Sequence, residues 1–413
     1  MADRICLDLE TGKVKMNKIL KYAVVGMAVV MLAGCGKTEE APKEEQKQQE
    51  EVKEEAEVTK EPTAEPTVEP TEEPEAEVTP EAEENNTDRL IQLPENPESV
   101  ADYTTVEGIA LEPGSRIAFV VKNTETGYWQ AVKKGIEQAV NELNTSLGYE
   151  GDDEIKFTFE GPKSETDVND QVNILDAIIS ENPTVICLAA VDMDSCLAQL
   201  EAAQENGIPV IVLDSGVNNM ELVQSSCATN NEEAGREAAR QLCAAIGDEG
   251  EVAVLSHGQH GESSKERVNG FQNEIAENHP QVSVVQVLYE PQTEKESPID
   301  VQAEAVLALY PDLKGFFSTN EVMGGIVLSV MEQHKDKNIA IVSFDLGQVQ
   351  EQAVRDGRIT GVISQNPYSM GYATVVAGAR AALGMENDGY IDAGYQWLDQ
   401  SNIDLEENKK YIY

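Results

Sequence analysis

The sequence has few basic residues for its length, and it lacks the common motifs of nucleotide binding and hydrolysis. It contains 30 lysines and arginines against 76 aspartates and glutamates, which gives a formal net charge of −46. A surface this negative repels phosphate backbones, so binding to nucleic acid is disfavoured. The sequence has no G-x-S-x-G, P-loop or G-x-G-x-x-G pattern, and therefore indicates neither a nucleophile elbow nor a nucleotide cradle.

Cysteine and histidine are also scarce, with six and four residues respectively. Cys187 lies in an apolar strand-like run and Cys243 in a helix-like one, which is typical of small buried hydrophobes. No C-x-x-C spacing suggests a disulfide framework or a metal site. His257 and His260 form an H-x-x-H in a glycine-rich loop without an acidic partner, which favours a structural or cleft-edge role over zinc. We expect no metal and no cofactor.

The apolar run at residues 19–33 is too short to span a bilayer but fits the core of a signal peptide. It follows Lys18 and ends in Leu32-Ala33-Gly34-Cys35, which resembles the bacterial lipobox. This resemblance implies that residues 1–35 are a lipoprotein signal and that Cys35 carries the lipid that anchors the protein.

The next segment, residues 36–100, is predicted to be an acidic disordered linker. Residues 36–88 contain twenty acidic residues, five lysines, no aromatic residue and repeats such as EPTAEPTVEPTEEP. Such a segment buries too little apolar surface to offset its ordering entropy. We expect a spacer that holds the folded part away from a membrane.

The remaining chain has room for two domains, and apolar strand-like runs alternate with helical stripes along it. Four such units predict an N-terminal lobe over residues 115–229, and five more predict a C-terminal lobe over residues 230–364. Uninterrupted apolar strands are typical of parallel sheets covered on both faces. The fold class is therefore α/β, with two doubly wound parallel-sheet lobes joined by a hinge and separated by a cleft.

Polar residues follow successive strands of both predicted lobes. Each of them can be a helix cap or turn residue, but five consecutive strand ends favour convergence on one ligand. The loop after the first strand leads into Tyr128 and Trp129, which either form a binding platform or simply pack under the first helix. The residues at the strand ends are Asp214, His257, Asn320 with Glu321, Asp345 and Gln365.

Several segments together carry a resemblance to a known family. They are IAFVVKNTETGYWQAVKKGIEQAV, NGIPVIVLDSGV, ESSKERVNGFQNEI, GFFSTNEVMGGIV, IAIVSFD and ISQNPYSMGYATV. From Arg116 to about Gly384 the chain resembles the type I periplasmic sugar-binding proteins, most closely the ribose-binding-like group. The resemblance implies that residues 365–395 return to the N-terminal lobe, and it leaves residues 396–413 as a C-terminal tail.

The same resemblance implies a sugar site between the lobes and no catalysis. Tyr128 and Trp129 match two aromatics that sandwich the sugar ring, and Phe344 matches an aromatic beside the site. The polar contacts implied by the family fall on Asp214, Arg267, Asn320, Asp345 and Gln365. Ser215 stands where ribose-binding members usually carry arginine, and Lys122 and Thr126 replace smaller polar groups. Ribose itself is therefore not indicated.

The leading hypothesis is a monomeric, lipid-anchored substrate-binding protein at the cell surface or in the periplasm, which binds a monosaccharide or related polyol and delivers it to an ABC permease. One alternative is a sensor that presents the same ligand to a membrane receptor. A second is an enzyme that uses cleft carboxylates as acid and base, for which no motif is found. A third is the effector domain of a repressor, which requires a helix-turn-helix where this chain has a signal peptide.

Overall fold

The computed structural model describes residues 91–293 and 295–413, and these residues form two lobes, each built on a six-stranded sheet. The predicted signal peptide, the lipobox-like sequence with Cys35 and the predicted linker up to residue 90 lie outside the described residues. No helix in the described ranges is both long and apolar enough to cross a bilayer.

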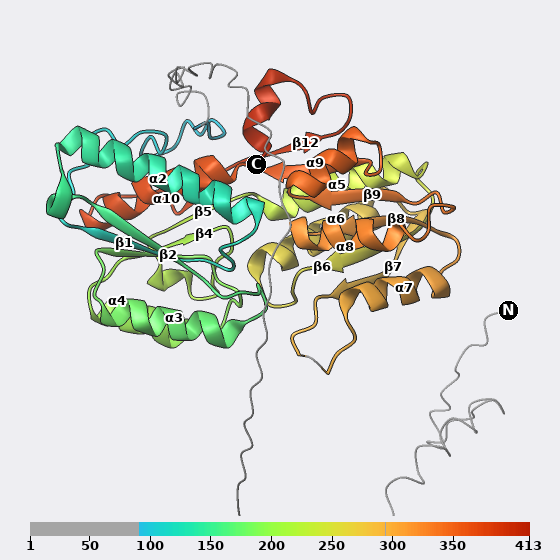
Figure 1. The fold of residues 1–413 in the computed structure, drawn as a ribbon, viewed down its shortest axis with the longest axis horizontal. Coiled ribbons are helices and arrows are strands. Elements are labelled where there is room, and N and C mark those ends of the chain that lie inside the picture. The colour runs from blue at the N-terminus through green and yellow to red at the C-terminus, as the bar shows by residue number, and fades with distance from the viewer. Residues whose placement is uncertain (1–90, 294) are drawn as a thin grey trace, which may run out of the picture. The chain divides into compact units, whose positions relative to one another are not determined.

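The N-terminal lobe has the strand order β11-β5-β4-β3-β1-β2, with every neighbouring pair parallel. Its helices lie on both faces of the sheet (Figure 1). Its elements are β1 (Arg116–Val120), α2 (Gly127–Leu147), β2 (Lys156–Glu160), α3 (Val168–Ser180), β3 (Val185–Leu188), α4 (Leu197–Glu205), β4 (Val210–Leu213), β5 (Ser225–Ala228), α10 (Pro367–Ala382) and β11 (Tyr390–Asp392).

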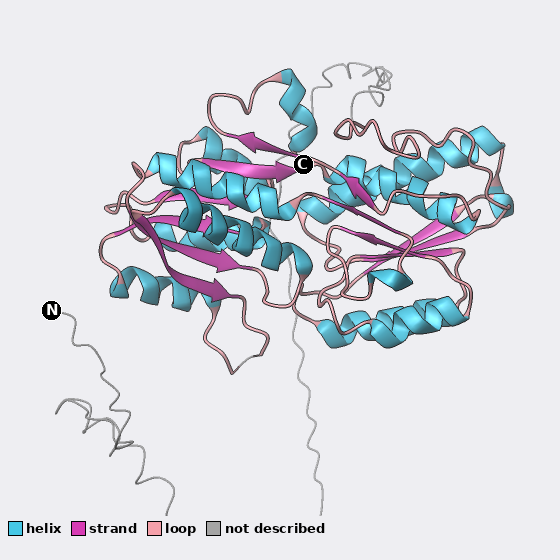
Figure 2. Cartoon of the chain, turned by 180° about the vertical axis from the view of Figure 1, so that it is seen from behind, coloured by secondary structure: helices cyan, strands magenta, loops and turns pink. Residues whose placement is uncertain are grey.

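The C-terminal lobe has the order β12-β10-β9-β8-β6-β7, in which only β12 runs antiparallel to its neighbour. Figure 2 shows helices on both sides of this sheet as well. Its elements are α5 (Asn231–Ala245), β6 (Gly250–Ser256), α6 (Glu262–Asn278), β7 (Val282–Tyr289), α7 (Ile299–Leu309), β8 (Leu313–Ser318), α8 (Glu321–Met331), β9 (Ala340–Phe344), α9 (Gln348–Arg355), β10 (Gly361–Gln365) and β12 (Tyr395–Leu398).

Each face of each sheet has its own apolar core, which explains the strand patterns in the sequence. In the N-terminal lobe, Phe119 packs toward α2 and α10, whereas Val120, the next residue, packs toward α3 and α4. Phe317 and Phe316 divide in the same way between the two cores of the C-terminal lobe. Because both faces of every central strand are covered, the strands are apolar throughout instead of alternating.

Three short connections pass between the lobes. They join β5 to α5, β10 to α10 and β11 to β12, so the chain enters the C-terminal lobe, returns, and leaves again. The predicted fold class is confirmed. The first connection runs from the end of β5 at Ala228 to the start of α5 at Asn231. The predicted return over residues 365–395 corresponds to α10 and β11.

Two boundaries differ from the prediction. Residues 91–100, assigned to the linker, pack onto the N-terminal lobe through Ile91 and Leu93. Residues 396–413 are not a free tail, because they contain most of β12 and a 3-10 helix, η4 (Glu406–Tyr411), that packs onto the C-terminal lobe. Strands β5, β11 and β12 are short and mixed in polarity, so the search for apolar runs missed them.

Candidate functional site

The two lobes meet around a small, enclosed cavity at the C-terminal ends of their strands. Its volume is about 20 Å³, which leaves room for roughly one water molecule. Thirteen residues line the cavity: Lys122, Thr126, Tyr128, Trp129, Glu165, Asp214, His257, Arg267, Asn320, Glu321, Val322, Asp345 and Gln365.

Two aspartates occupy equivalent places in the two lobes. Asp214 directly follows β4 and Asp345 directly follows β9, and their φ angles are 60° and 67°. Both therefore lie in the left-handed region, which aspartate tolerates better than most side chains. The tight turns aim both carboxylates into the cleft, where they are 3% and 4% exposed.

On the N-terminal lobe, Asp214 is held by a cation and a phenol. The ammonium group of Lys122 lies 2.7 Å from Oδ2, and the hydroxyl of Tyr128 donates to Oδ1 at 2.7 Å. Burial alone would raise the pKa of Asp214, but Lys122 and Arg267 outweigh burial and lower it. The carboxylate is therefore ionised, and Lys122 also reaches the opposite lobe by donating to Ser263 Oγ at 3.2 Å.

Arg267 is a buried cation of the C-terminal lobe, 2% exposed. Its Nε donates to Asn231 at 2.9 Å and its Nη1 to the Thr319 carbonyl at 2.7 Å. The guanidinium lies over the ring of Phe344, with Cζ 3.7 Å from the ring centroid. Its Nη2 has no hydrogen-bond partner among the described residues. The guanidinium is thus held by two of its nitrogens, and the third, Nη2, is left available as a donor at the cavity.

Helices α5 and α6 approach closely enough to fix this arginine. A Cβ added at Gly235 of α5 would lie 2.3 Å from the carbonyl oxygen of Arg267. Only glycine permits this contact, so the α6 backbone that carries Arg267 lies directly against α5.

Asp345 has partners on several segments. Its Oδ1 accepts hydrogen bonds from Gln365 Nε2 at 2.7 Å and from the Tyr413 hydroxyl at 3.1 Å, and its Oδ2 accepts one from the Glu321 amide at 3.3 Å. Burial nevertheless raises the pKa of this carboxyl, although Arg267 and the hydrogen bond from Gln365 act to lower it. Gln365 Oε1 has no partner in the described chain, so this residue, which lines the same cavity as Arg267, has an acceptor left available.

Glu165, in the loop between β2 and α3, connects the lobes across the cleft. One oxygen accepts from Trp129 Nε1 at 2.9 Å in its own lobe, and the other accepts from Asn320 Nδ2 at 3.1 Å in the opposite lobe. Asn320 also caps α8, because its Oδ1 accepts from the Met323 amide. Capping and cleft contact are therefore compatible in one side chain.

The two aromatics do not form the sandwich that the family resemblance implied. The rings of Tyr128 and Trp129 are 5.1 Å apart and nearly perpendicular, with an interplanar angle of 84°. Two perpendicular rings offer no parallel faces to a sugar held between them. Both residues line the cavity, but the hydroxyl of Tyr128 already donates a hydrogen bond to Asp214.

Seven of the eight site residues predicted from the sequence line this one cavity, and the eighth, Phe344, lies against the guanidinium of Arg267. Lys122, Thr126, His257 and Glu321 were noticed in the sequence without being assigned to the site. Glu165 and Tyr413 were missed, since neither follows a strand-end or helical pattern. His257 is neutral here, because burial, Lys122 and Arg267 together hold its pKa well below the usual range.

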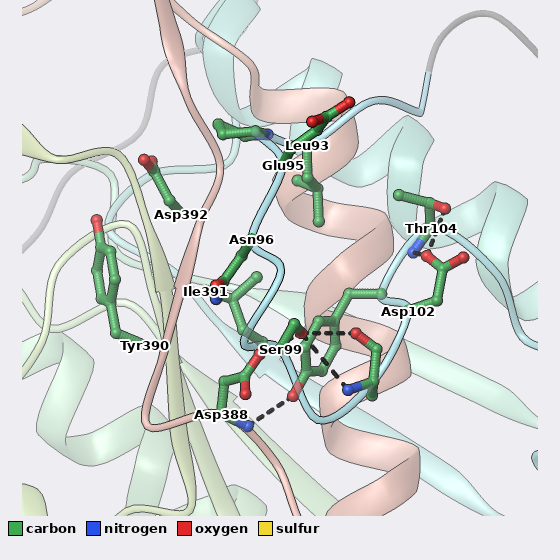
Figure 3. A pocket seen from close by; sticks show the side chains of 13 residues that line it. Leu93, Glu95, Asn96, Ser99, Asp102, Thr104, Asp388, Tyr390, Ile391 and Asp392 are labelled. Carbon is green, nitrogen blue, oxygen red and sulfur yellow. Dashed lines mark hydrogen bonds between the residues drawn. The ribbon is translucent and has the colours of Figure 1, made fainter.

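A larger pocket, about 690 Å³, lies elsewhere on the N-terminal lobe between residues 93–104 and 388–392. One of its acidic residues, Asp388, holds the N-terminal segment. Asp388 accepts from the Val100 amide and from Ser99, and its own amide donates to the Tyr103 hydroxyl. Figure 3 shows Ser99 next to Asp388 in this pocket. The pocket is therefore explained by the docking of this segment.

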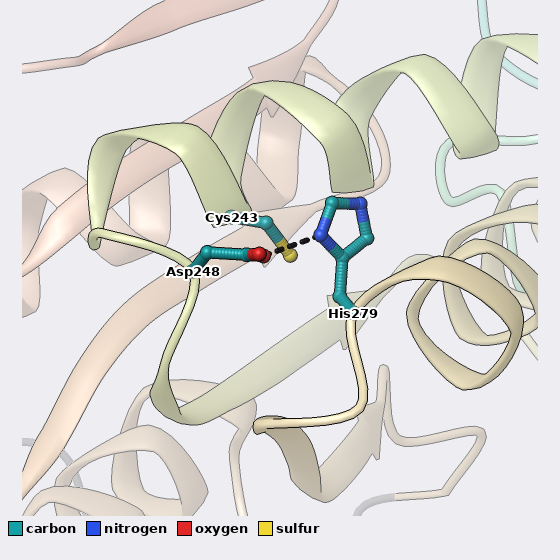
Figure 4. A group of neighbouring side chains, drawn as sticks. All are labelled: Cys243, Asp248 and His279. Atoms are coloured by element: carbon teal, nitrogen blue, oxygen red, sulfur yellow. Dashed lines mark hydrogen bonds and ion pairs between the residues drawn. The ribbon is translucent and has the colours of Figure 1, made fainter.

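Among the described residues, one group brings three possible metal ligands together, namely Cys243, Asp248 and His279 (Figure 4). Asp248 and His279 already share a hydrogen bond near the ends of α5 and α6. Burial, followed by the charges of Asp248 and Glu274, raises the pKa of the Cys243 thiol to about 12. A protonated thiol beside an occupied carboxylate is no prepared metal site, and we assign it no metal.

A family model described as a periplasmic binding protein domain matches residues 117–386. The chain belongs to this family of periplasmic binding proteins. The match covers both lobes, from β1 to the end of α10, and so agrees with the two-lobed fold. Because this is a family of ligand-binding proteins, the chain is a binding protein and not an enzyme.

Relatives of this periplasmic binding protein include named sugar-binding proteins. The ribose import binding protein of Escherichia coli is 25% identical, over 66% of this chain and 86% of that protein. The D-apiose import binding protein of Actinobacillus succinogenes is 23% identical, over 63% of this chain and 79% of that protein.

A solved solute-binding protein of an ABC transporter from Agrobacterium vitis, with bound D-fucose, is 29% identical with a TM-score of 0.66. The match spans 72% of this chain and all of that one. A second, from Agrobacterium radiobacter in complex with D-arabinose, is 25% identical with a TM-score of 0.65 and covers 72% of this chain and 99% of that one.

Proposed function

We propose that this protein is the substrate-binding component of an ABC importer and that it binds a monosaccharide or related polyol between its lobes. The observation that carries the proposal is the pair of unused groups in the closed cleft. Arg267 Nη2 is a buried donor and Gln365 Oε1 a buried acceptor, and neither has a partner among the described residues. Leaving such groups unpaired is costly, and a ligand rich in hydroxyl groups satisfies both.

The rest of the cleft supports the same ligand class. The carboxyl groups of Asp214 and Asp345 provide acceptors for hydroxyl groups, and Lys122 and Asn320 provide donors. Trp129 supplies an apolar ring against which the C–H groups of a sugar can pack. A ligand that touches both lobes stabilises the closed arrangement, which then presents a surface of both lobes to the permease.

Thermal unfolding with a panel of monosaccharides tests this proposal. The panel includes D-ribose, D-apiose, D-fucose and D-arabinose, the sugars named for the relatives above. A sugar bound only by the folded protein raises the unfolding temperature, and the same sugar should leave Arg267→Met unchanged. If no member of the panel shifts the wild type, the proposed ligand class is wrong.

We further propose that the protein is a monomer anchored outside the cytoplasm by a lipid on Cys35, with residues 36–90 as the spacer. The lipobox-like LAGC and the acidic composition of the spacer support this arrangement. A single chain contains both lobes of the site, so a monomer is sufficient to bind the sugar.

A further inference from the structure

Tyr413, the last residue of the sequence, reaches the sugar-binding aspartate of the C-terminal lobe. Its hydroxyl donates to Asp345 Oδ1 at 3.1 Å and accepts from the amide of Leu346, the next residue, at 3.2 Å. One phenol therefore fixes both the carboxylate and the backbone that follows it. Asp345 is held in a left-handed conformation, with φ 67°, so it depends on such support more than an ordinary strand residue does.

The ring of Tyr413 packs on the other lobe. It meets the ring of Tyr128 edge to face, at a centroid distance of 5.9 Å, and it joins the apolar core of the N-terminal lobe. Tyr411 and Ile412 pack instead on the core of the C-terminal lobe. The Tyr411 carbonyl also accepts a hydrogen bond from Ser364 Oγ, next to Gln365, at 2.6 Å.

The phenol is suited to donate to a carboxylate. Burial, followed by the charge of Asp345, raises the pKa of Tyr413 well above its usual value, so the hydroxyl keeps its proton. A donor to an ionised carboxylate forms one of the stronger classes of hydrogen bond and favours the charged form. Gln365 shares the same oxygen, so the two donors together determine where that oxygen points.

We propose that Tyr413 is a positioning residue of the binding site, which holds Asp345 ionised and oriented toward the cleft and whose ring links this aspartate to Tyr128. The consequence for ligand affinity rests on the proposed function, whereas the consequence for Asp345 itself does not. Of the strand-end residues identified from the sequence, Gln365 donates to the same oxygen of Asp345. The second donor, Tyr413, comes from a segment after the last strand, β12.

The direct test is the pKa of Asp345 in the ligand-free protein, followed by carbon NMR of its carboxyl group, which Asp345→Asn assigns. Tyr413→Phe keeps the ring and removes only the donor, so the pKa of Asp345 should rise by about one unit. The matched control is Tyr411→Phe, which alters a tyrosine two residues away and should leave it unchanged. Other ionisable groups near Asp345 are retained in every variant, namely Arg267, Asp214, Glu165, Glu321 and Tyr128.

The second measurement is a double-mutant cycle with whichever panel sugar stabilises the wild type most. Tyr413→Phe should weaken its binding by about tenfold in the wild type and by less than twofold in an Asp345→Asn background. In an Asp214→Asn background most of the tenfold loss should persist, because the hydrogen bonds of Tyr413 go to Asp345 and Leu346 and not to Asp214. An unchanged Asp345 pKa, or an unchanged affinity, overturns the proposal. If no sugar binds even the wild type, the proposed function fails while the pKa still decides the role of Tyr413.

Discussion

Lys122 and Asp214 form a buried ion pair, 2.7 Å apart, in which the two side chains are only 6% and 3% exposed. Such a pair contributes little net stability compared with an apolar pair, but removal of one partner leaves the other buried and unpaired. Its position at the cavity is better explained by binding than by folding. The pair presents an ionised acceptor and a cation at the place where a ligand must be recognised.

This buried pair predicts that removing Lys122 alone costs more stability than removing the charges of Lys122 and Asp214 together. Lys122→Met should lower the free energy of unfolding by about 3–5 kcal/mol, because Asp214 then remains charged without its partner. The double variant with Asp214→Asn should regain a large part of the loss. Chemical denaturation measures both. Lys133→Met is the control, since Lys133 pairs with Glu137 at 3.8 Å on an exposed helix face and should cost less than about 1 kcal/mol.

His257 predicts a dependence of stability on pH. Its pKa is held well below the unfolded value of about 6.5, so the unfolded chain takes up a proton that the folded protein does not. The stability from neutral His257 is complete above pH 6.5 and is lost as the pH falls toward the folded pKa. The slope is at most about 1.4 kcal/mol per pH unit.

Urea unfolding of His257→Gln between pH 7 and pH 5 checks this. The difference in unfolding free energy between wild type and variant should shrink as the pH falls. His334→Gln serves as control, because His334 is partly exposed and paired with Glu304. A difference that stays constant over this range would mean that His257 takes up its proton at the same pH in the folded and in the unfolded protein.

Trp129 predicts an optical signal for ligand binding. The sequence has two tryptophans, Trp129 in the cleft and Trp397 on β12, so Trp397→Phe isolates the first. Sugar that enters the cleft changes the surroundings of Trp129 and of its hydrogen bond to Glu165, and the emission should change with it. Trp129→Phe in the protein that retains Trp397 should abolish the fluorescence change. A change that persists in this variant would place the ligand away from Trp129.

The lipobox-like sequence that ends in Cys35 predicts a lipid anchor on this residue. One lipid chain binds a membrane only marginally, so stable attachment requires the two chains of a diacylglyceryl group. Cell fractionation of Cys35→Ala should find the protein released, or retained as an uncleaved precursor. Cys187→Ala is a suitable control for the loss of a cysteine, since Cys187 is buried in β3. Mature Cys35→Ala protein in the membrane fraction would refute the anchor.

The site residues that could be predicted from the sequence share one physical origin. Asp214, Asp345 and Gln365 lie at the ends of uniformly apolar strands, and the ends of parallel strands meet at one edge of a sheet. Glu165 and Tyr413 have no such marker. Both reach the cleft from irregular segments. Glu165 lies 155 residues in sequence from its partner Asn320, and Tyr413 lies 68 residues from its partner Asp345, so only the folded chain brings them together.

The helices and strands likewise divide into those that carry a pattern in the sequence and those that do not. Long apolar strands and striped helices were recognisable because burial imposes a period on them. β5 and β11 were missed because their sequences, SSCA and YID, are mixed in polarity and contain no apolar run. The segment at residues 91–100 was grouped with the acidic linker by composition, yet Ile91 and Leu93 dock on the N-terminal lobe.

Calorimetric titration of the monosaccharide panel into wild type, Asp345→Ala and Arg267→Ala tests the central claim most directly. Each variant removes a charged, desolvated partner of the ligand, which costs roughly 2–5 kcal/mol. We expect one sugar to bind the wild type with one site per chain and both variants at least about a hundredfold more weakly, with their folding intact by circular dichroism. If no sugar binds the wild type, or if both variants bind that sugar as tightly as the wild type does, the cleft is not a sugar site and these residues serve the fold alone.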